Sequence, residues 1–410
     1  MGAALPHPIR TKWIERHGDQ NYTVASAEMQ GWRSTMEDAK SVCLKLNDRH
    51  KDLALFGVYD GHAGSQCSTY LEKAVPAAVG KLAKPTKKHD LIDAMLAVDE
   101  EFLSNPHART NGSTCVFTVV LDLIAVLVVR PRRAHPHKSS KSSSVDSSGS
   151  NSSSSSSASG QREKPSSSTG QKLFEVTVSN IGDSRAVLLR ADGRWKLLTR
   201  DHKPSNAEEK ERIEKAEGKV DNSRVDGQLA LSRAMGDWHY KQNGKLKPHE
   251  QKVVAIPEIS RILAAEGDSL LLCCDGIFEK LTTAEVCSFV HEDMVASGNK
   301  EPALTLARLL DLSLDRGSKD NMTAVCITFK NGSDYGQVGN ELIPGRYFEY
   351  SKDEKFKTAY LKFAKSHGFE GEALFSKIPK QMKQRVDVAN TGEEKAADND
   401  GSENSETAPI

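Results

Sequence analysis

The stretch Leu53-Ala54-Leu55-Phe56-Gly57-Val58-Tyr59-Asp60-Gly61-His62 decides the fold. Its first seven residues have the length and apolar composition of a buried β-strand, and they end at a carboxylate. A second apolar run, Leu270-Leu271-Leu272-Cys273-Cys274, ends in the same way at Asp275-Gly276. Either Asp-Gly pair alone fits an ordinary turn. The repeat instead indicates two buried strands that each carry a carboxylate into a cleft.

Further acidic residues flank other strand-like runs, namely Glu37-Asp38 and Asp320. Carboxylates that converge at strand ends repel one another unless a cation holds them. Oxygen ligands without His or Cys favour the hard cations Mg²⁺ and Mn²⁺. We therefore expect a metal-dependent site for phosphoryl chemistry.

A series of short blocks continues this pattern between about residues 22 and 330. The blocks are Met29–Arg33 with Glu37–Ala39, Phe56–Gly64, Gly112–Thr114, Asn180–Ala186, Asp201–Pro204, Leu231–Asp237, Cys274–Phe278 and Ser318–Thr323. In this content and order the chain resembles the PP2C-type (PPM family) metal-dependent protein serine/threonine phosphatases.

The resemblance implies an α+β fold, an α-β-β-α sandwich in which two central, mainly antiparallel β-sheets are flanked by helices. It also implies an enzyme that hydrolyses phosphoserine and phosphothreonine in proteins through a hydroxide bridging two divalent cations, Mg²⁺ or Mn²⁺. The alternatives are a catalytically inactive PP2C-like binding module and a metal-dependent hydrolase of small phosphoesters. An inactive relative would be expected to have lost metal ligands, and here all the carboxylates are present.

The resemblance assigns the metal ligands. Asp60 would bridge both cations, and their shell would be completed by Glu37, Asp275, Asp320 and the backbone carbonyl of Gly61. Asp183 is either an ordinary turn residue or, with Asp275, a ligand of a weaker third metal.

Other residues would act on the substrate or on water. Arg33 would hold the phosphate with its planar guanidinium, and His62 would protonate the leaving oxygen. Asp38 would accept hydrogen bonds from metal-bound water. Asp237 is expected to be structural or to shape the site. Lys40 departs from the family, which often has His at this position.

Composition limits the partners. The 410 residues include 56 basic and 56 acidic ones, so the net charge is zero. A neutral chain has no broad field for nucleic acid or membranes, and we expect phosphoproteins as partners, no nucleic acid and a monomer. The apolar run 115–129 contains Asp122 and is too short for a transmembrane segment.

Cysteine usage and the termini suggest a location. Seven cysteines without a C-x-x-C pair favour reduced thiols and an intracellular protein. We expect the cytoplasm, with the nucleus as the alternative because of the basic cluster at 130–133. Met1-Gly2 begins like a myristoylation signal, but Pro6 stands where Ser or Thr is usual, so we expect an ordinary N-terminus, with N-terminal acylation as the alternative.

The periodicity of apolar residues predicts the secondary structure. Strands are expected at 53–59, 115–121, 173–180, 185–190, 252–256, 269–274 and 323–329, and helices at 65–82, 88–104, 206–217, 282–297 and 302–315. The turn Gly182-Asp183-Ser184 predicts a hairpin. Ser205 and Glu208 predict a capping box, with Gly218 as the left-handed stop.

Composition and motif positions divide the chain into parts. We expect an N-terminal segment (1–21), a phosphatase domain (22–330), a partly helical C-terminal extension (331–390) and an acidic, disordered tail (391–410). Within the domain, residues 130–171 are expected to be a disordered insertion, because 18 of the 30 residues at 139–168 are serine. The resemblance implies that this insertion lies in a hairpin loop. In the extension, a helix is expected at 353–365.

Overall fold

The computed structural model describes residues 4–106, 110–123, 172–298, 301–332 and 338–377. The predicted serine-rich insertion, the basic cluster at 130–133 and the acidic tail lie outside the described residues. Within the described ranges, no helix combines the length and the apolar character needed to cross a membrane.

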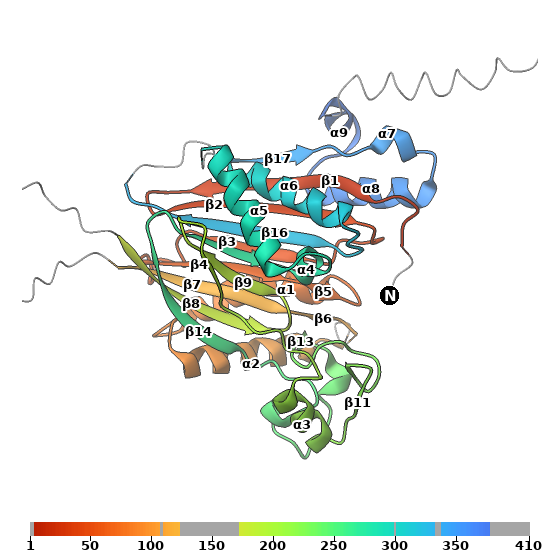
Figure 1. The fold of residues 1–410 in the computed structure, drawn as a ribbon. Coiled ribbons are helices and arrows are strands. Elements are labelled where there is room, and N and C mark those ends of the chain that lie inside the picture. Colours follow the sequence, from red (N-terminus) through yellow and green to blue (C-terminus); the bar gives the residue numbers. More distant parts are fainter. Residues whose placement is uncertain (1–3, 107–109, 124–171, 299–300, 333–337, 378–410) are drawn as a thin grey trace, which may run out of the picture.

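Two antiparallel sheets form the centre of the molecule (Figure 1). The first has the order β10 (Trp195–Leu197), β9 (Arg185–Leu189), β15 (Ser269–Cys273), β16 (Met322–Phe329), β2 (Tyr22–Gly31), β1 (Ile9–Gly18) and β17 (Gly339–Ile343). The second has the order β14 (Glu258–Ala265), β8 (Leu173–Ile181), β7 (Cys115–Leu123), β4 (Leu53–Tyr59) and β3 (Ala39–Cys43).

Strand β4 lies in an environment that explains why its sequence is apolar throughout. Ala54, Phe56 and Val58 belong to the core cluster that includes residues of both sheets. Leu55 and Tyr59 point to the opposite face and join the cluster built with helices. Because successive side chains alternate between faces, a strand covered on both faces is apolar at every position.

Aromatic packing joins the sheets. The ring of Tyr22 on β2 lies with its centroid 5.7 Å from those of Phe56 on β4 and Phe174 on β8. Buried aromatic pairs of this kind add about 0.5–1.5 kcal/mol beyond their area burial. These contacts pack the two sheets against each other.

Helices cover the outer faces of the sandwich. The five-stranded sheet packs against α1 (Gln66–Lys81) and α2 (Lys88–Ser104). The seven-stranded sheet packs against α5 (Thr283–Ala296) and α6 (Pro302–Asp315), which cross it in Figure 1. The predicted α-β-β-α sandwich with antiparallel sheets is thereby confirmed.

Two smaller parts border this core. One contains α3 (Ala207–Lys215), β11 (Val220–Asp221) and β12 (Arg224–Val225), seen at the bottom of Figure 1. The other contains α7 (Tyr347–Tyr350), α8 (Glu354–Ser366) and α9 (Gly371–Lys377). The helix predicted at 353–365 is confirmed as α8. Its apolar face packs against β1 and β17, and the residues it buries include Phe356, Tyr360 and Phe363.

The predicted hairpin at Gly182-Asp183-Ser184 is wrong. Strand β8 pairs with β7 and β14 in one sheet, whereas β9 pairs with β10 and β15 in the other. The three residues therefore carry the chain across from one sheet to the other. This crossing brings Asp183 to the end of the sandwich where the carboxylates lie.

The strand predicted at 252–256 is also wrong. Its apolar residues are buried, but among the described residues this segment forms only a single bridge, from Val254 to Arg233. Val253 packs in the small lobe with α3 and Ala255 packs in the core with α1 and α2, so burial without a partner strand produced the apolar pattern. The neighbouring segment 258–265 is the strand instead.

Helix α3 begins and ends differently from the prediction. Asn206 occupies the N-cap position without a side-chain capping bond, and Glu208 pairs with Arg200 at 3.0 Å. The left-handed residue at its C-terminal end is Glu217, with φ 63°, and not Gly218. Gly218 instead donates its backbone N–H to the carbonyl of Ile213 at 2.9 Å, which closes a Schellman-type end.

Candidate active site

A cleft of about 620 Å³ lies at the end of the sandwich and gathers most of the predicted site residues. They are Arg33, Glu37, Asp60, Gly61, His62, Asp183, Asp275 and Asp320. Arg224, Gln228 and Leu229 reach the cleft from the lobe with α3. Asp38 does not line the cleft, but one of its carboxylate oxygens lies within 4.8 Å of an Asp60 oxygen and of the Cys274 sulfur.

Strand ends place the acidic side chains. Asp60 follows β4 directly, and Asp275 follows β15 and begins the short helix α4 (Asp275–Phe278). Asp320 precedes β16, and Glu37 and Asp38 precede β3. The backbone N–H of Asp60 donates to Oγ1 of Thr114 at 3.1 Å, which holds the end of β4 against β7. Neighbouring strands therefore present carboxylates to one point.

Burial and mutual repulsion raise the pKa values of several of these carboxylates. Burial, followed by the charges of Asp275 and Asp38, raises the pKa of Asp60 well above its ordinary value. Burial together with neighbouring carboxylates raises the pKa of Asp38 to about 8 and that of Asp275 to about 7. The Oδ2 atom of Asp38 is buried and has no hydrogen-bond partner among the described residues. Such a cluster fits a divalent cation, which would allow all of these groups to ionise.

Cys274 lies among these carboxylates but does not fit as a ligand. Burial raises the pKa of its thiol well above the ordinary value. The thiol donates to the carbonyl of Asn321 at 3.6 Å and accepts from the backbone N–H of Thr323 at 3.1 Å. The ligand set is therefore all oxygen, as the hard cations prefer.

Two side-chain cations pair with acids of the cleft. Nη2 of Arg33 donates to Oδ2 of Asp320 at 2.6 Å, and Lys203 pairs with Asp183. Arg33 is about one-third exposed, so its guanidinium is accessible from the cleft. Burial lowers the pKa of Arg33, but the charge of Asp320, the hydrogen bond to it and the charges of Glu37 and Asp60 together produce a net rise.

His62 is oriented by a residue far away in the sequence. Its Nε2 lies 2.9 Å from both carboxylate oxygens of Asp237, which is 7% exposed. Burial lowers the pKa of His62, but the charge of Asp237 and the hydrogen bonds to it produce a net rise. Asp237 thus favours the protonated imidazolium. Sequence motifs identified only the block that contains Asp237, without this contact.

Two glycines are required by close approach. A Cβ atom on Gly61 would lie 2.2 Å from the carbonyl oxygen of Glu37, and one on Gly112 would lie 2.3 Å from Nε2 of His62. Neither distance is tolerated by a real side chain. Asn321 holds the backbone of Glu37 in place, because its Oδ1 accepts from the backbone N–H of Glu37 at 2.9 Å.

Comparison with known proteins decides the family. The family described as Protein phosphatase 2C matches residues 22–129 and 131–322, well over half of the chain. The chain belongs to the protein phosphatase 2C (PP2C) family.

Individual relatives support the same family assignment. Protein phosphatase 1B of Homo sapiens is 34% identical over 354 residues, covering 81% of this chain and 62% of the relative. This chain therefore spans less than two thirds of the human relative. A probable protein phosphatase 2C 4 of Paramecium tetraurelia is 31% identical over 347 residues, covering 80% of this chain and 99% of the relative. A crystal structure of a Toxoplasma gondii phosphatase has a TM-score of 0.64 at 29% identity and covers 82% of this chain and 100% of that one.

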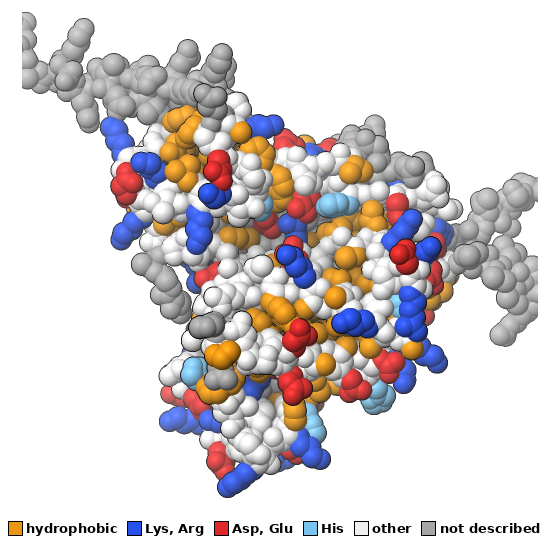
Figure 2. Space-filling model, turned by 180° about the vertical axis from the view of Figure 1, so that it is seen from behind, with side chains coloured by type: hydrophobic (Ala, Val, Ile, Leu, Met, Phe, Trp, Pro, Cys, Tyr) orange, Lys and Arg blue, Asp and Glu red, His pale blue; other side chains and the backbone are white. Residues whose placement is uncertain are grey.

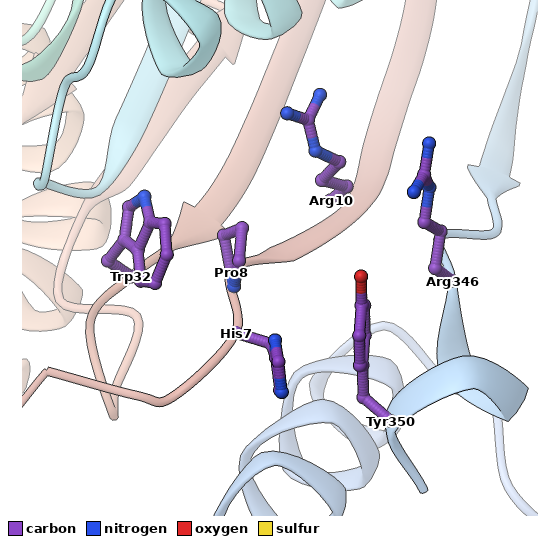
Figure 3. A pocket seen from close by; sticks show the side chains of 6 residues that line it. All are labelled: His7, Pro8, Arg10, Trp32, Arg346 and Tyr350. Carbon is purple, nitrogen blue, oxygen red and sulfur yellow. The ribbon is translucent and has the colours of Figure 1, made fainter.

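A second pocket lies at Trp32, the neighbour of Arg33 in the sequence (Figure 3). It has a volume of about 300 Å³ and is lined by His7, Pro8, Arg10, Trp32, Arg346 and Tyr350. The guanidinium groups of this pocket are already paired, Arg10 with Asp315 and Arg346 with Glu349 at 3.4 Å. None of the described residues that line it is acidic, so the metal-binding features belong to the PP2C cleft.

Proposed function

We propose that this PP2C member hydrolyses phosphoserine and phosphothreonine in proteins, with two divalent cations, Mg²⁺ or Mn²⁺. The observation that supports this most is the carboxylate cluster of Asp60, Asp275 and Asp38, whose pKa values are all raised when no cation compensates their charge. Burying these carboxylates together costs free energy, and an inactive binding module would gain nothing from it.

The ligands in this proposal are Asp60, shared between the cations, with Glu37, Asp275, Asp320 and the carbonyl of Gly61 around them. When bound, the cations would neutralise the phosphate charge and lower the pKa of a water that attacks phosphorus. Asp38, close behind Asp60, would accept a proton or hydrogen bond from that water. Arg33 would hold the phosphate while remaining paired with Asp320, since a guanidinium has donors for both.

His62 would act as the general acid. Its raised pKa favours the imidazolium form, which offers a proton to the departing Ser or Thr oxygen. Asp237 would orient the ring and stabilise its charge without touching the substrate.

A third cation between Asp183 and Asp275 would bind more weakly than the other two. The carboxylate of Asp183 is paired with the ammonium of Lys203. A cation at this position must displace or share that partner, which lowers its net gain.

Partners and location belong to the same proposal. We propose phosphoprotein partners, no nucleic acid and a monomer, in keeping with the basic and acidic side chains that are interspersed on the face shown in Figure 2. Location in the cytoplasm, with the nucleus as the alternative, is supported by seven cysteines, all within the described ranges, that form no disulfide. The phosphatase domain proposed is 22–330, with 1–21 before it and the extension and tail after it.

The test compares substrates at saturating Mn²⁺. The purified chain should release phosphate from a phosphothreonine peptide much faster than from ATP or a nucleoside monophosphate. A preference for the nucleotides would favour the hydrolase of small phosphoesters. No release from any of them, by a protein that binds Mn²⁺, would favour the inactive binding module.

A further inference from the structure

We propose that helix α8 of the C-terminal extension positions the catalytic loop, residues 32–38 between β2 and β3, through a buried row of contacting side chains, from His367 through Glu28 to Lys40. This inference rests on the proposed function, because its consequence is the geometry of Glu37 and Asp38. These three residues, His367, Glu28 and Lys40, form the charge chain.

The charge chain is continuous and shielded from solvent. Nζ of Lys40 lies 2.9 Å from Oε2 of Glu28 and 3.4 Å from Oε1 of Glu15. Nε2 of His367 lies 3.0 Å from Oε1 of Glu28. The side chains of Lys40, Glu28 and His367 are 9%, 7% and 13% exposed. Lys40 and Glu28 are opposite charges that compensate one another at this burial, and the imidazole of His367 lies against the other oxygen of Glu28.

One end of the charge chain lies directly after the catalytic loop. Lys40 is on β3, two residues after Asp38, and β3 is in register with β4, with Ala39 opposite Tyr59. Asp60 follows Tyr59 directly. The position of Lys40 along β3 therefore sets where Asp38 lies relative to Asp60.

The other end lies on α8. His367 follows the last turn of this helix and stacks on the indole of Trp13, with ring centroids 4.8 Å apart and an interplanar angle of 18°. Trp13 is opposite Glu28 between β1 and β2, and Glu28 is opposite Thr323 between β2 and β16. The backbone N–H of Thr323 donates to the thiol of Cys274 at 3.1 Å, and that thiol lies within 4.8 Å of an Asp38 oxygen. A second row of residues thus leads from α8 toward the same carboxylate.

Open space beside the segment 35–40 increases the importance of the ion pairs that hold this segment. A cavity of about 850 Å³ lies between α8 and the loop and is lined by residues that include Lys40, Glu28, Phe363 and His367. Thr35, Glu37 and Ala63 line both this cavity and the catalytic cleft. The segment 35–40 therefore lies between this cavity and the catalytic cleft, with open space on both sides. This space reduces the apolar support of the segment, so the ion pairs with Glu28 and Glu15 become important in holding it.

The family resemblance does not supply this arrangement. The position of Lys40 is often His in the family, and a longer, permanently charged side chain at this position reaches the two carboxylates on β1 and β2. The structure thus assigns Lys40, Glu28 and His367 as positioning residues. None of them is placed on the substrate or on the cations.

The test measures cation binding directly in the full chain. His367→Leu removes the contact with Glu28, and Lys365→Met changes an exposed residue of the same helix that pairs with Glu370. Mn²⁺ affinity is measured by calorimetry, and the Mn²⁺ concentration for half-maximal hydrolysis of p-nitrophenyl phosphate is measured well below the unfolding temperature. For residues hydrogen-bonded to a metal ligand the loss is typically about 10- to 100-fold, so for this more remote contact we expect about threefold or more.

Additional variants separate positioning from stability. Glu28→Gln should weaken Mn²⁺ binding to a similar degree, and the Glu28→Gln/His367→Leu double variant should add little to either single change. Lys40→Arg, which keeps the charge, should retain most of the affinity. The KM for p-nitrophenyl phosphate should stay the same at saturating Mn²⁺.

The outcomes are distinct. If His367→Leu and Glu28→Gln bind Mn²⁺ as Lys365→Met does, even with lower thermal stability, the charge chain is only structural and the inference is wrong. If the wild-type chain binds Mn²⁺ but hydrolyses nothing, the proposed function fails, while the calorimetry still decides whether α8 positions the site.

Discussion

Replacing Gly61 by alanine tests whether the backbone at this position must touch the catalytic loop. The added Cβ would lie 2.2 Å from the carbonyl oxygen of Glu37 and 2.8 Å from Oγ of Ser68, while real Cβ atoms essentially never approach closer than 3.0 Å. The Glu37 carbonyl must therefore move by about 0.8 Å, the difference between 3.0 and 2.2 Å. A misplacement of about 1 Å can reduce a rate by about 10²-fold, and overpacking of this kind costs roughly 1–3 kcal/mol of stability.

The assay is turnover of p-nitrophenyl phosphate over a range of Mn²⁺ concentrations, with urea unfolding as the check on stability. Gly244→Ala is the matched control, because a Cβ at Gly244 meets no described atom within 4 Å. We expect Gly61→Ala to lose about two orders of magnitude in rate and to need more Mn²⁺, and Gly244→Ala to behave as wild type. A Gly61→Ala rate within twofold of the wild-type rate would refute the role assigned to this contact.

The general acid, the buried Asp38 and the serine-rich insertion each lead to a further prediction. His62→Gln should slow phosphothreonine peptide hydrolysis by about 10²–10⁴-fold but p-nitrophenyl phosphate hydrolysis far less, since nitrophenolate leaves without a proton; equal losses would show that His62 only shapes the cleft. In EDTA, thermal stability should fall as the pH rises from about 5 to about 8, because the pKa of Asp38 is raised from 3.8 to about 8 and the folded state therefore holds the extra proton. Asp60 and Asp275, whose pKa values are also raised, contribute to the same slope; Asp38→Asn should therefore make it shallower, and an unchanged slope would mean that the other groups cause it. Deleting residues 135–169 should leave folding and activity intact, because β7 and β8 pair in register up to Leu123 and Leu173; loss of the fold on deletion would show that the insertion packs on the domain.

The sequence predicted the strands whose environment is simple. Strand β4 is covered on both faces, so all its residues are apolar and its pattern is unmistakable. Strands β1 and β2 were missed because they carry buried polar residues such as Lys12, Glu28 and Gln30. These side chains are paired or hydrogen-bonded within the fold, and a pattern based on hydropathy cannot register that compensation.

Sheet membership was the feature that local sequence could not provide. The turn at Asp183 has the composition of a hairpin, yet its flanking strands belong to different sheets. Whether the chain turns back or crosses over depends on partner strands such as β15, which lies much further along the chain. Motifs placed Asp183 near the site, but only the tertiary structure explains how it gets there.

For the candidate site, too, local sequence predicted the residues but not the contacts between distant parts of the chain. Its carboxylates lie in short blocks and could be named from the sequence. The contact of His62 with Asp237 joins residues 175 positions apart, and that of Glu28 with His367 joins two ends of the chain. Neither contact has a local signal, because each depends on how distant strands and helices pack.

The most direct test of the central claim is Mn²⁺-dependent phosphate release from a phosphothreonine peptide by wild type and by Asp60→Asn, with Mn²⁺ binding measured on the same samples. The exposed Asp192→Asn variant is the control, since Asp192 pairs with Arg194 at the surface. We predict that Asp60→Asn loses both Mn²⁺ binding and release, that Asp192→Asn loses neither, and that EDTA abolishes release by wild type. Near-normal release by Asp60→Asn, or undiminished release by wild type in excess EDTA, would contradict a phosphatase centred on cations held by Asp60.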